Sequence, residues 1–322
     1  MNQFDNLARQ SIIVADTGDI EQIRKYKPTD ATTNPSLIYK AAKLPQYEHL
    51  IDEAIAYTAN KPANERLEWT MDRLAVNFAA EIAAIVPGVV SVEVDASIAF
   101  KPKRTANRAR RMIAMLEQKG VPRSKILIKI AATWYGIKAA EQLEKEGIHC
   151  NLTLIFNLEA QAAACAEAGV TLISPFVGRV RDWQIANKTA PKGVDDDDGV
   201  ILVRKIYNYY QRHGYKTIVM GASFRTKEEV LALAGCDKLT IGPKFLKQLS
   251  DSNDPVPQHL FKNAGAVVAP PKGPVDDRHF YQRLCNDPMA LEKLHAGIRG
   301  FMKDGKACAD MISKRMMKSK LC

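Results

Sequence analysis

The sequence lacks the segments that carry proteins into or across a membrane. Its first ten residues contain no apolar h-region, and no run of about 18 or more apolar residues occurs in the chain. We therefore expect neither a signal peptide nor a membrane-spanning helix. The six cysteines form no C-x-x-C pair and no regular framework, which predicts free thiols, a cytoplasmic protein and no membrane partner.

Motifs for metal, nucleotide and serine-hydrolase sites are also missing. The six histidines show no ligand spacing such as H-x-x-x-H, so no metal centre is predicted. No G-x-G-x-x-G follows the first predicted strand, and the chain has neither a P-loop nor a G-x-S-x-G elbow. These absences argue against a metalloenzyme, a dinucleotide-binding enzyme and an α/β-hydrolase.

The net charge of +10 raises the question of a nucleic-acid partner. The basic residues are scattered, however, and their densest clusters lie at 101–104, 108–111 and 314–320. The chain contains no RNP motif, zinc-finger spacing or basic zipper. We therefore predict no nucleic-acid partner and favour phosphorylated metabolites as the anions that this protein binds.

What the sequence does contain is a regular alternation of short apolar runs and helix-like segments. A glycine typical of a helix C-cap ends five of these segments, and Thr226-x-x-Glu229 is a capping-box pattern. The predicted strands lie at 11–18, 30–37 (the weakest), 89–96, 125–133, 150–156, 171–178, 216–223 and 238–243. Alternating units predict an α/β fold with a parallel sheet, and eight of them favour a closed (β/α)8 TIM barrel over an open sheet.

The alternation stops near residue 250. A segment rich in proline and glycine follows, and residues 276–320 are helix-like again. We predict one domain over residues 1–322, with a barrel core at about 11–250 and a helical C-terminal appendage at about 251–322.

Polar residues occur late in seven of the eight predicted strands. Active sites of barrel enzymes lie at the C-terminal ends of the strands, so these side chains are expected to share one rim. They are Asp16, Asn34, Glu93 with Asp95, Lys129, Asn151 with Thr153, Ser174 and Ser223, and Arg179 and Arg225 lie just beyond two strand ends. Any one of them alone fits a satisfied buried hydrogen-bonding group, whereas the whole set indicates a functional site.

Lys129 indicates the chemistry. It lies between Ile128 and Ile130 and has no neighbour in sequence with which to pair. An apolar strand disfavours the charged form of an amine, and a neutral amine attacks ketone carbonyls. The alternatives are a lysine that reaches solvent or one that pairs with a carboxylate of the barrel.

The other charged groups suit acid–base and anion-binding roles. Asp16 and Glu93 could divide the proton transfers of lysine-based carbon–carbon cleavage, although one of them could simply pair with Lys129. Arg179 and Arg225 match the geometry of a phosphate, although either could be a surface charge. The acidic run at 195–198 fits a solvated loop or the start of a helix better than a cation site.

Several motifs together resemble those of the classical transaldolases. They are "VADTGDI", "DATTNPSLI", "VSVEVDA", "ILIKIAATWYGIKAAEQLEKEGIHCNLTLIF", "LISPFVGR" and "VMGASFR". The resemblance runs from about residue 4 to the C-terminus. It implies a barrel of the class I aldolase type with a helical C-terminal extension, no metal and no organic cofactor, and a homodimer.

The resemblance also implies roles for individual residues. Lys129 matches the Schiff-base lysine, Asp16 matches the acid/base on the C4 hydroxyl, and Glu93 and Thr153 match the pair that holds the catalytic water. Other positions match contacts to the dihydroxyacetone portion, a wall of the cavity, and the phosphate and sugar. These are Asn34, Asn151 and Ser174 for the first, Phe176 for the second, and Arg179, Ser223 and Arg225 for the third.

The implied reaction transfers a dihydroxyacetone unit from a ketose phosphate (sedoheptulose 7-phosphate or fructose 6-phosphate) to an aldose phosphate (glyceraldehyde 3-phosphate or erythrose 4-phosphate), within the pentose phosphate pathway. Two alternatives stay open. One is a lyase of the fructose-6-phosphate aldolase kind that releases free dihydroxyacetone, and the other is an inactive barrel that binds sugar phosphates. The residues alone predict a lysine-dependent lyase or transferase acting on phosphates.

Overall fold

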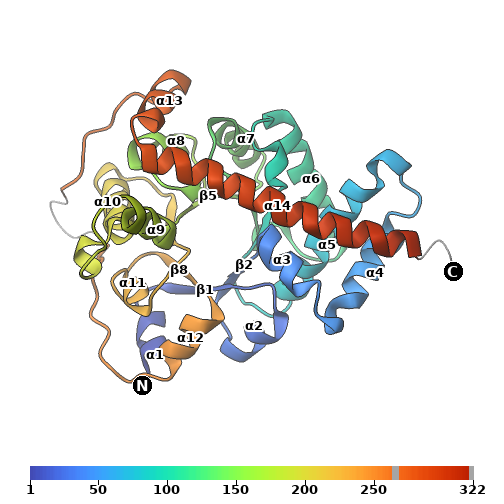
Figure 1. Cartoon of the computed structure of the whole chain (residues 1–322), viewed down its shortest axis with the longest axis horizontal. Helices are drawn as coiled ribbons and strands as arrows, with labels where there is room; N and C mark the ends of the chain where they lie inside the picture. The colour runs from blue at the N-terminus through green and yellow to red at the C-terminus, as the bar shows by residue number, and fades with distance from the viewer. Residues whose placement is uncertain (263–267, 319–322) are drawn as a thin grey trace.

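Eight parallel strands close into a barrel in which each strand pairs with its neighbours in chain order (Figure 1). The computed structural model describes residues 1–262 and 268–318. The strands are β1 (Ile12–Asp16), β2 (Asp30–Thr32), β3 (Val90–Glu93), β4 (Ile126–Ala131), β5 (Cys150–Ile155), β6 (Leu172–Pro175), β7 (Ile218–Gly221) and β8 (Lys238–Ile241). The predicted (β/α)8 barrel is confirmed, and each predicted apolar run contains one strand.

Helices connect the strands and cover the outside of the barrel (Figure 1). They are α1 (Gln3–Ala8), α2 (Ile20–Tyr26), α3 (Pro35–Ala41), α4 (Glu48–Tyr57), α5 (Ala63–Ala83), α6 (Pro102–Gln118), α7 (Trp134–Lys145), α8 (Ala163–Glu167), α9 (Val177–Asn187), α10 (Asp198–His213), α11 (Lys227–Leu231) and α12 (Pro243–Ser250). Thr226 and Glu229 form the predicted capping box at α11. Gly120, Gly147, Gly169, Gly214 and Gly235 have φ angles between 68° and 95°, the left-handed conformation that a helix C-cap favours.

The acidic run at 195–198 begins helix α10, as one of the two preferred interpretations predicted. Asp197 is the N-cap, and its carboxylate accepts hydrogen bonds from the backbone N–H groups of Gly199 and Val200. The same carboxylate is fully buried and lies 2.7 Å from Arg181. The run therefore stabilises a helix start.

The inside of the barrel is layered. Val14, Leu127, Leu172 and Met220 form one apolar cluster contributed by β1, β4, β6 and β7. Side chains two residues apart on a strand point to the same face, so the next inward positions on β1, β4 and β6 are polar. They are Asp16, Lys129 and Ser174. The apolar cluster thus forms a floor, and the polar side chains lie above it at the C-terminal ends of the strands.

A second strand lysine lies at the opposite end of the barrel. Lys238, at the start of β8, is paired with Asp30 at the start of β2, and both side chains are buried. Asp30 also accepts a hydrogen bond of 2.8 Å from the backbone N–H of Val89. Lys238 therefore forms a structural ion pair at the N-terminal end of the barrel, whereas the polar layer lies at the C-terminal end.

The chain after β8 ends in two further helices, α13 (Asp277–Cys285) and α14 (Pro288–Lys318), and α14 crosses the mouth of the barrel (Figure 1). It packs against α3, α5, α9 and β5. Residues 263–267 and 319–322 of the predicted appendage, including Cys322 and the end of the basic cluster at 314–320, lie outside the described residues. The five cysteines within the described part form no disulfide. No helix in residues 1–262 and 268–318 is both long enough and apolar enough to cross a membrane.

Candidate active site

A cavity of about 390 Å³ opens at the C-terminal ends of the strands, and Phe301 and Asp304 of α14 line it. Eight of the eleven residues predicted from the sequence line it. They are Asp16, Asn34, Lys129, Ser174, Phe176, Arg179, Ser223 and Arg225. The residues predicted from the strand ends thus come together from β1, β4, β6, the loops after β2, β6 and β7, and the start of α9.

The ammonium of Lys129 is buried and has a carboxylate partner. The side chain lies 3.2 Å from Glu93 Oε2 and donates a hydrogen bond of 3.3 Å to the backbone carbonyl of Thr33. The pairing arises because Glu93 on β3 and Lys129 on β4 are partners in the strand register. Of the interpretations that the sequence left open, the pairing with a barrel carboxylate is the one observed. This pairing also places a proton acceptor, the Glu93 carboxylate, next to the amine.

The two predicted carboxyl groups have pKa values displaced in the same direction. Burial raises the pKa of Glu93, against the opposing effect of Lys129. Burial also raises the pKa of Asp16, against the opposing charges of Lys129, Lys40 and Arg179. A carboxylate with a raised pKa accepts protons more readily than an ordinary one, which suits both groups to acid–base work near neutral pH.

Three predicted residues do not line this cavity. Glu93 faces a neighbouring cavity, whereas Asn151 and Thr153 are fully buried. The Asn151 amide donates to Ser91 Oγ at 3.0 Å and accepts from Ser174 Oγ at 2.6 Å, which fixes the hydroxyl of Ser174 at the cavity wall. Thr153 Oγ1 and Glu93 Oε1 are buried, and neither has a hydrogen-bond partner among the described residues.

Two arginines, Arg179 and Arg225, also line the cavity and bring positive charge to it. Arg225 forms an ion pair of 2.7 Å with Asp182, whereas Arg179 has no carboxylate within ion-pair distance in the described part of the chain. The Arg179 guanidinium lies 5.1 Å from the Phe176 ring and 5.6 Å from the Phe301 ring. Burial and the charge of Arg225 lower the pKa of Arg179, so an anion between the two guanidiniums would relieve their repulsion.

Backbone geometry holds the two arginine-bearing segments together. Ser223 has a φ of 63°, an uncommon conformation for a residue with a side chain. Its carbonyl accepts a hydrogen bond of 2.8 Å from Gly178 N. A Cβ at Gly178 would lie 2.3 Å from that carbonyl oxygen, so only glycine permits this approach.

Among the polar or aromatic residues that line the cavity and that sequence reasoning missed, four lie on helices α3 and α14. Ser36 and Lys40 lie on α3, directly after Asn34, which caps this helix through a 2.9 Å hydrogen bond from Leu37 N. Phe301 and Asp304 come from α14, and Asp304 accepts a hydrogen bond from the Ser36 hydroxyl. Ser36 and Lys40 could have been predicted, because they closely follow Asn34 at the end of a predicted strand. The second pair had no signal in the sequence, because α14 lies outside the repeating units.

No group of three or more His, Cys, Asp or Glu side chains in residues 1–262 and 268–318 is arranged to hold a metal ion. The predicted ionisable groups of the site are one amine, two carboxyl groups and two guanidiniums.

Comparison with known proteins places this geometry in context. The sequence matches the family described as "Transaldolase/Fructose-6-phosphate aldolase" over residues 13–312. It is 51% identical over 319 residues to transaldolase A of Escherichia coli (strain K12), covering 98% of this chain and 100% of the relative. It is 53% identical over 316 residues to transaldolase A of Pasteurella multocida (strain Pm70), covering 96% and 98%. It is also 51% identical over 318 residues to the transaldolase of Haemophilus ducreyi (strain 35000HP), covering 98% and 100%.

Proposed function

Because the chain belongs to the transaldolase/fructose-6-phosphate aldolase family, we propose that it is a transferase that moves a dihydroxyacetone unit between sugar phosphates. The donor is sedoheptulose 7-phosphate or fructose 6-phosphate, and the acceptor is glyceraldehyde 3-phosphate or erythrose 4-phosphate, as in the pentose phosphate pathway. One observation carries the proposal: the buried Lys129 meets Glu93 at 3.2 Å and faces a cavity that also holds Asp16 and two arginines.

The first step in this proposal is formation of a Schiff base. Glu93 takes a proton from the Lys129 ammonium, and the neutral amine adds to the C2 carbonyl of the ketose phosphate. The resulting carbinolamine hydroxyl takes up a proton that Glu93 returns through a water held at Thr153, and it leaves as water. The unpartnered oxygens of Glu93 and Thr153 support this placement of the water.

The second step is cleavage and transfer. Asp16 takes the proton of the C4 hydroxyl, whose oxygen then forms the aldehyde carbonyl of the departing aldose phosphate. The electrons of the C3–C4 bond flow into the protonated imine on Lys129 and give a bound three-carbon enamine. The enamine carbon attacks the aldehyde of the acceptor, and Asp16 returns its proton to the new hydroxyl.

The remaining predicted residues are proposed to hold the substrate. The first group contacts the dihydroxyacetone end, and the second contacts the sugar and phosphate. The groups are Asn34, Asn151 and Ser174 for the first, and Arg179, Ser223 and Arg225 for the second, while Phe176 forms a wall of the cavity. Two observations support the phosphate assignment. Arg179 has no carboxylate partner among the described residues, and the charge of Arg225 lowers the pKa of Arg179.

An acceptor-dependence experiment separates the transferase from the lyase alternative. With fructose 6-phosphate alone, the proposed enzyme should release glyceraldehyde 3-phosphate in a burst equal to the number of active sites and then stop, because the enamine stays on Lys129. Addition of erythrose 4-phosphate should restart turnover. The measurement is a coupled assay of glyceraldehyde 3-phosphate by rapid mixing. Continuous release without an acceptor would favour the lyase, and the absence of any burst would favour an inactive barrel.

The approach of α14 to the arginine site gives a further prediction. A Cβ at Gly297 would lie 2.6 Å from Leu154 Cδ2 and 2.9 Å from Arg179 Nη1, and Leu154 is fully buried with a φ of 61°. Because Leu154 cannot retreat, Gly297→Ala should displace Arg179 and raise KM for fructose 6-phosphate about tenfold, or ~1.4 kcal/mol. Steady-state kinetics test this expectation.

Gly300 in the same helix is the matched control. A Cβ there meets no atom within 4 Å, so Gly300→Ala should leave KM unchanged and raise the free energy of unfolding by ~0.5–1 kcal/mol through helix propensity. Equal KM values for the two variants would contradict a role of the Gly297 contact in placing Arg179.

We further propose that the enzyme is a cytoplasmic homodimer whose chain forms a single domain, with the barrel core at about 11–250. Free thiols at all five described cysteines support a reducing compartment. Sedimentation equilibrium of the full chain tests the dimer, since a monomer mass at micromolar concentration would contradict it.

A further inference from the structure

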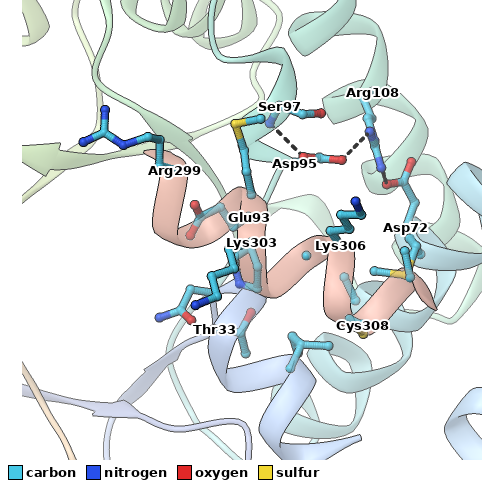
Figure 2. A pocket seen from close by; sticks show the side chains of 18 residues that line it. Thr33, Asp72, Glu93, Asp95, Ser97, Arg108, Arg299, Lys303, Lys306 and Cys308 are labelled. Carbon is cyan, nitrogen blue, oxygen red and sulfur yellow. Dashed lines mark hydrogen bonds and ion pairs between the residues drawn. The ribbon is translucent and has the colours of Figure 1, made fainter. Parts of the chain in front are cut away.

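Helix α14 divides the mouth of the barrel between two cavities. One contains Lys129 and the arginines, and the other, of about 580 Å³, lies between α14, α3, α5 and the segment after β3 (Figure 2). Asn34 lines both cavities. The second cavity is larger than the first, and the proposed reaction uses only Glu93 and Asn34 of the residues that line it.

The side of the second cavity formed by α14 carries unbalanced positive charge. Arg299, Lys303 and Lys306 follow one another at spacings of four and three residues, which places them on one face of the helix. None of the three forms an ion pair with any residue in the described ranges. All three are exposed at the opening.

The acidic side chains of this cavity are already neutralised. Arg108 pairs with Asp72 at 2.7 Å and with Asp95 at 3.3 Å, as the dashed lines in Figure 2 show, and Arg111 forms a second ion pair with Asp72. Glu93 pairs with Lys129. The positive charges of α14 are therefore left to attract an anion.

The rest of the wall is mainly apolar. Ile38, Met71, Ala75, Met302 and Ala309 line it, from α3, α5 and α14. A site with an apolar wall and a few charged groups at one side binds a ligand that has an apolar body and a charged end. A bare phosphate or a free sugar would leave this wall without a contact.

Glu93 connects the second cavity to the chemistry. Its carboxyl group is buried, and Oε1 has no hydrogen-bond partner in the described part of the chain. Because Glu93 lines the second cavity and its Oε2 lies 3.2 Å from Lys129 Nζ, an occupant of this cavity lies one residue away from the amine. The occupant would reach Glu93 without entering the cavity that Arg179 and Arg225 line.

We propose that the second cavity is a binding site for an amphipathic organic anion, such as an aryl phosphate, sulfonate or carboxylate. Its anionic group binds at Lys303 and Lys306, its apolar body packs against Met71 and Ala75, and it inhibits the enzyme from the Glu93 side. The binding stands independently of the proposed function, and only the inhibition rests on it.

The test uses 8-anilinonaphthalene-1-sulfonate, an aryl sulfonate whose fluorescence rises in apolar surroundings, titrated against the full chain. We expect one site per chain. The double variant Lys303→Glu/Lys306→Glu should raise Kd at least about tenfold, because two attractive charges become repulsive. Lys314→Glu is the matched control, since Lys314 is exposed on the same helix about 12 Å further along and does not line this cavity. An unchanged Kd in the double variant, or an equal loss in the control, would overturn the proposal.

Two further variants locate the probe. Ala75→Phe fills the apolar part of the cavity and should abolish binding while basal turnover and thermal stability remain near wild type. Arg225→Gln alters the other cavity and should leave the Kd unchanged. If Arg225→Gln abolished binding while Ala75→Phe did not, the probe would lie at the arginines and the proposal would be wrong.

Kinetics with fructose 6-phosphate and erythrose 4-phosphate test the link through Glu93. The probe should lower kcat, and saturating fructose 6-phosphate should not overcome the inhibition. Purely competitive inhibition would overturn the second-cavity assignment, and binding without inhibition would overturn the link to Glu93. If the wild-type chain showed no activity in this assay, the proposed function would be refuted. The fluorescence titration would still test binding to the second cavity.

Discussion

Lys129→Met is expected to abolish covalent trapping of the substrate and to lower kcat/KM by about five orders of magnitude, because the proposed Schiff base forms on the amine that is paired with Glu93 above the apolar floor of the barrel. Methionine fills a similar volume but cannot form a Schiff base. With borohydride and fructose 6-phosphate, the wild-type chain should gain the mass of one reduced three-carbon unit on the peptide that contains Lys129. Intact-mass and peptide mass spectrometry measure both results.

The same substitution at Lys125 is the matched control. Lys125 precedes β4 and donates two hydrogen bonds of 2.9 Å to the carbonyls of Ala83 and Val86, away from the cavity. Lys125→Met should lose ~1–3 kcal/mol of stability and retain trapping. Trapping on any lysine in the Lys129→Met variant, Lys238 included, would contradict the assignment of the nucleophile.

Removal of Lys129 also leaves Glu93 without its ion-pair partner. Breaking a buried pair commonly costs ~3–5 kcal/mol when the remaining charge stays ionised. Burial already raises the pKa of Glu93 against the charge of Lys129, so without Lys129 the carboxyl group should hold its proton at still higher pH. The cost of the substitution should therefore be smaller at pH 5 than at pH 8, which thermal melts across this range measure.

The barrel could be predicted from the sequence because the same local pattern recurs eight times. Each strand is a short apolar run, and glycines with positive φ end the intervening helices at positions such as Gly147 and Gly214. The weakest prediction, at 30–37, corresponds to a strand of only three residues, because Pro35 begins α3 with Asn34 as its cap. A polar residue late in such a run is predicted to lie at the C-terminal end of the barrel, since period-two alternation fixes the face on which it lies.

Local deviations inside predicted elements could not be read from the sequence. The segment at 158–169 lies between two predicted strands, where the alternation favours an ordinary helix, but it begins with a π-helical turn at Leu158–Ala162. Gln161 accepts a hydrogen bond from Phe156 N and donates to the carbonyls of Ala132 and Leu154. These side-chain bonds come from residues brought together by the barrel, so no pattern within the segment encodes them.

The partners of the predicted site residues required the three-dimensional structure for a similar reason. The pairing of Lys129 with Glu93 depends on the register between β3 and β4, which the separate runs do not specify. The contributions of Phe301 and Asp304 depend on where α14 lies. The strand-end residues of the cavity could be predicted from the repeating units, whereas the position of the predicted C-terminal helix across the cavity and the second cavity beside it could not.

Asp16→Asn is expected to separate the two halves of the reaction. The variant keeps Lys129 and Glu93, so borohydride should still trap a Schiff base, here with the uncleaved six-carbon sugar phosphate. Cleavage should slow by about three orders of magnitude, because an amide cannot accept the C4 hydroxyl proton. A three-carbon adduct formed at the wild-type rate would contradict the assignment of Asp16 as the base. Asp19→Asn is the control, since Asp19 caps α2 and bonds to the Tyr47 hydroxyl outside the cavity.

The pH dependence of stability gives Asp16→Asn a second readout. Burial raises the pKa of Asp16 above its ordinary value of 3.8, so the folded state holds this proton more tightly than the unfolded chain does. The stabilising contribution of the protonated group is therefore complete below pH 3.8 and is lost as the pH rises through the folded-state pKa. Replacement by the neutral amide removes this loss. The variant should thus exceed the wild type in free energy of unfolding by about 1 kcal/mol at neutral pH, and the difference should shrink toward pH 4 in denaturant titrations. Asp16, the proposed base of cleavage, would then destabilise the fold in its ionised form. If the difference in free energy of unfolding between the variant and the wild type stayed constant across pH, burial of the ionised Asp16 would carry no such cost.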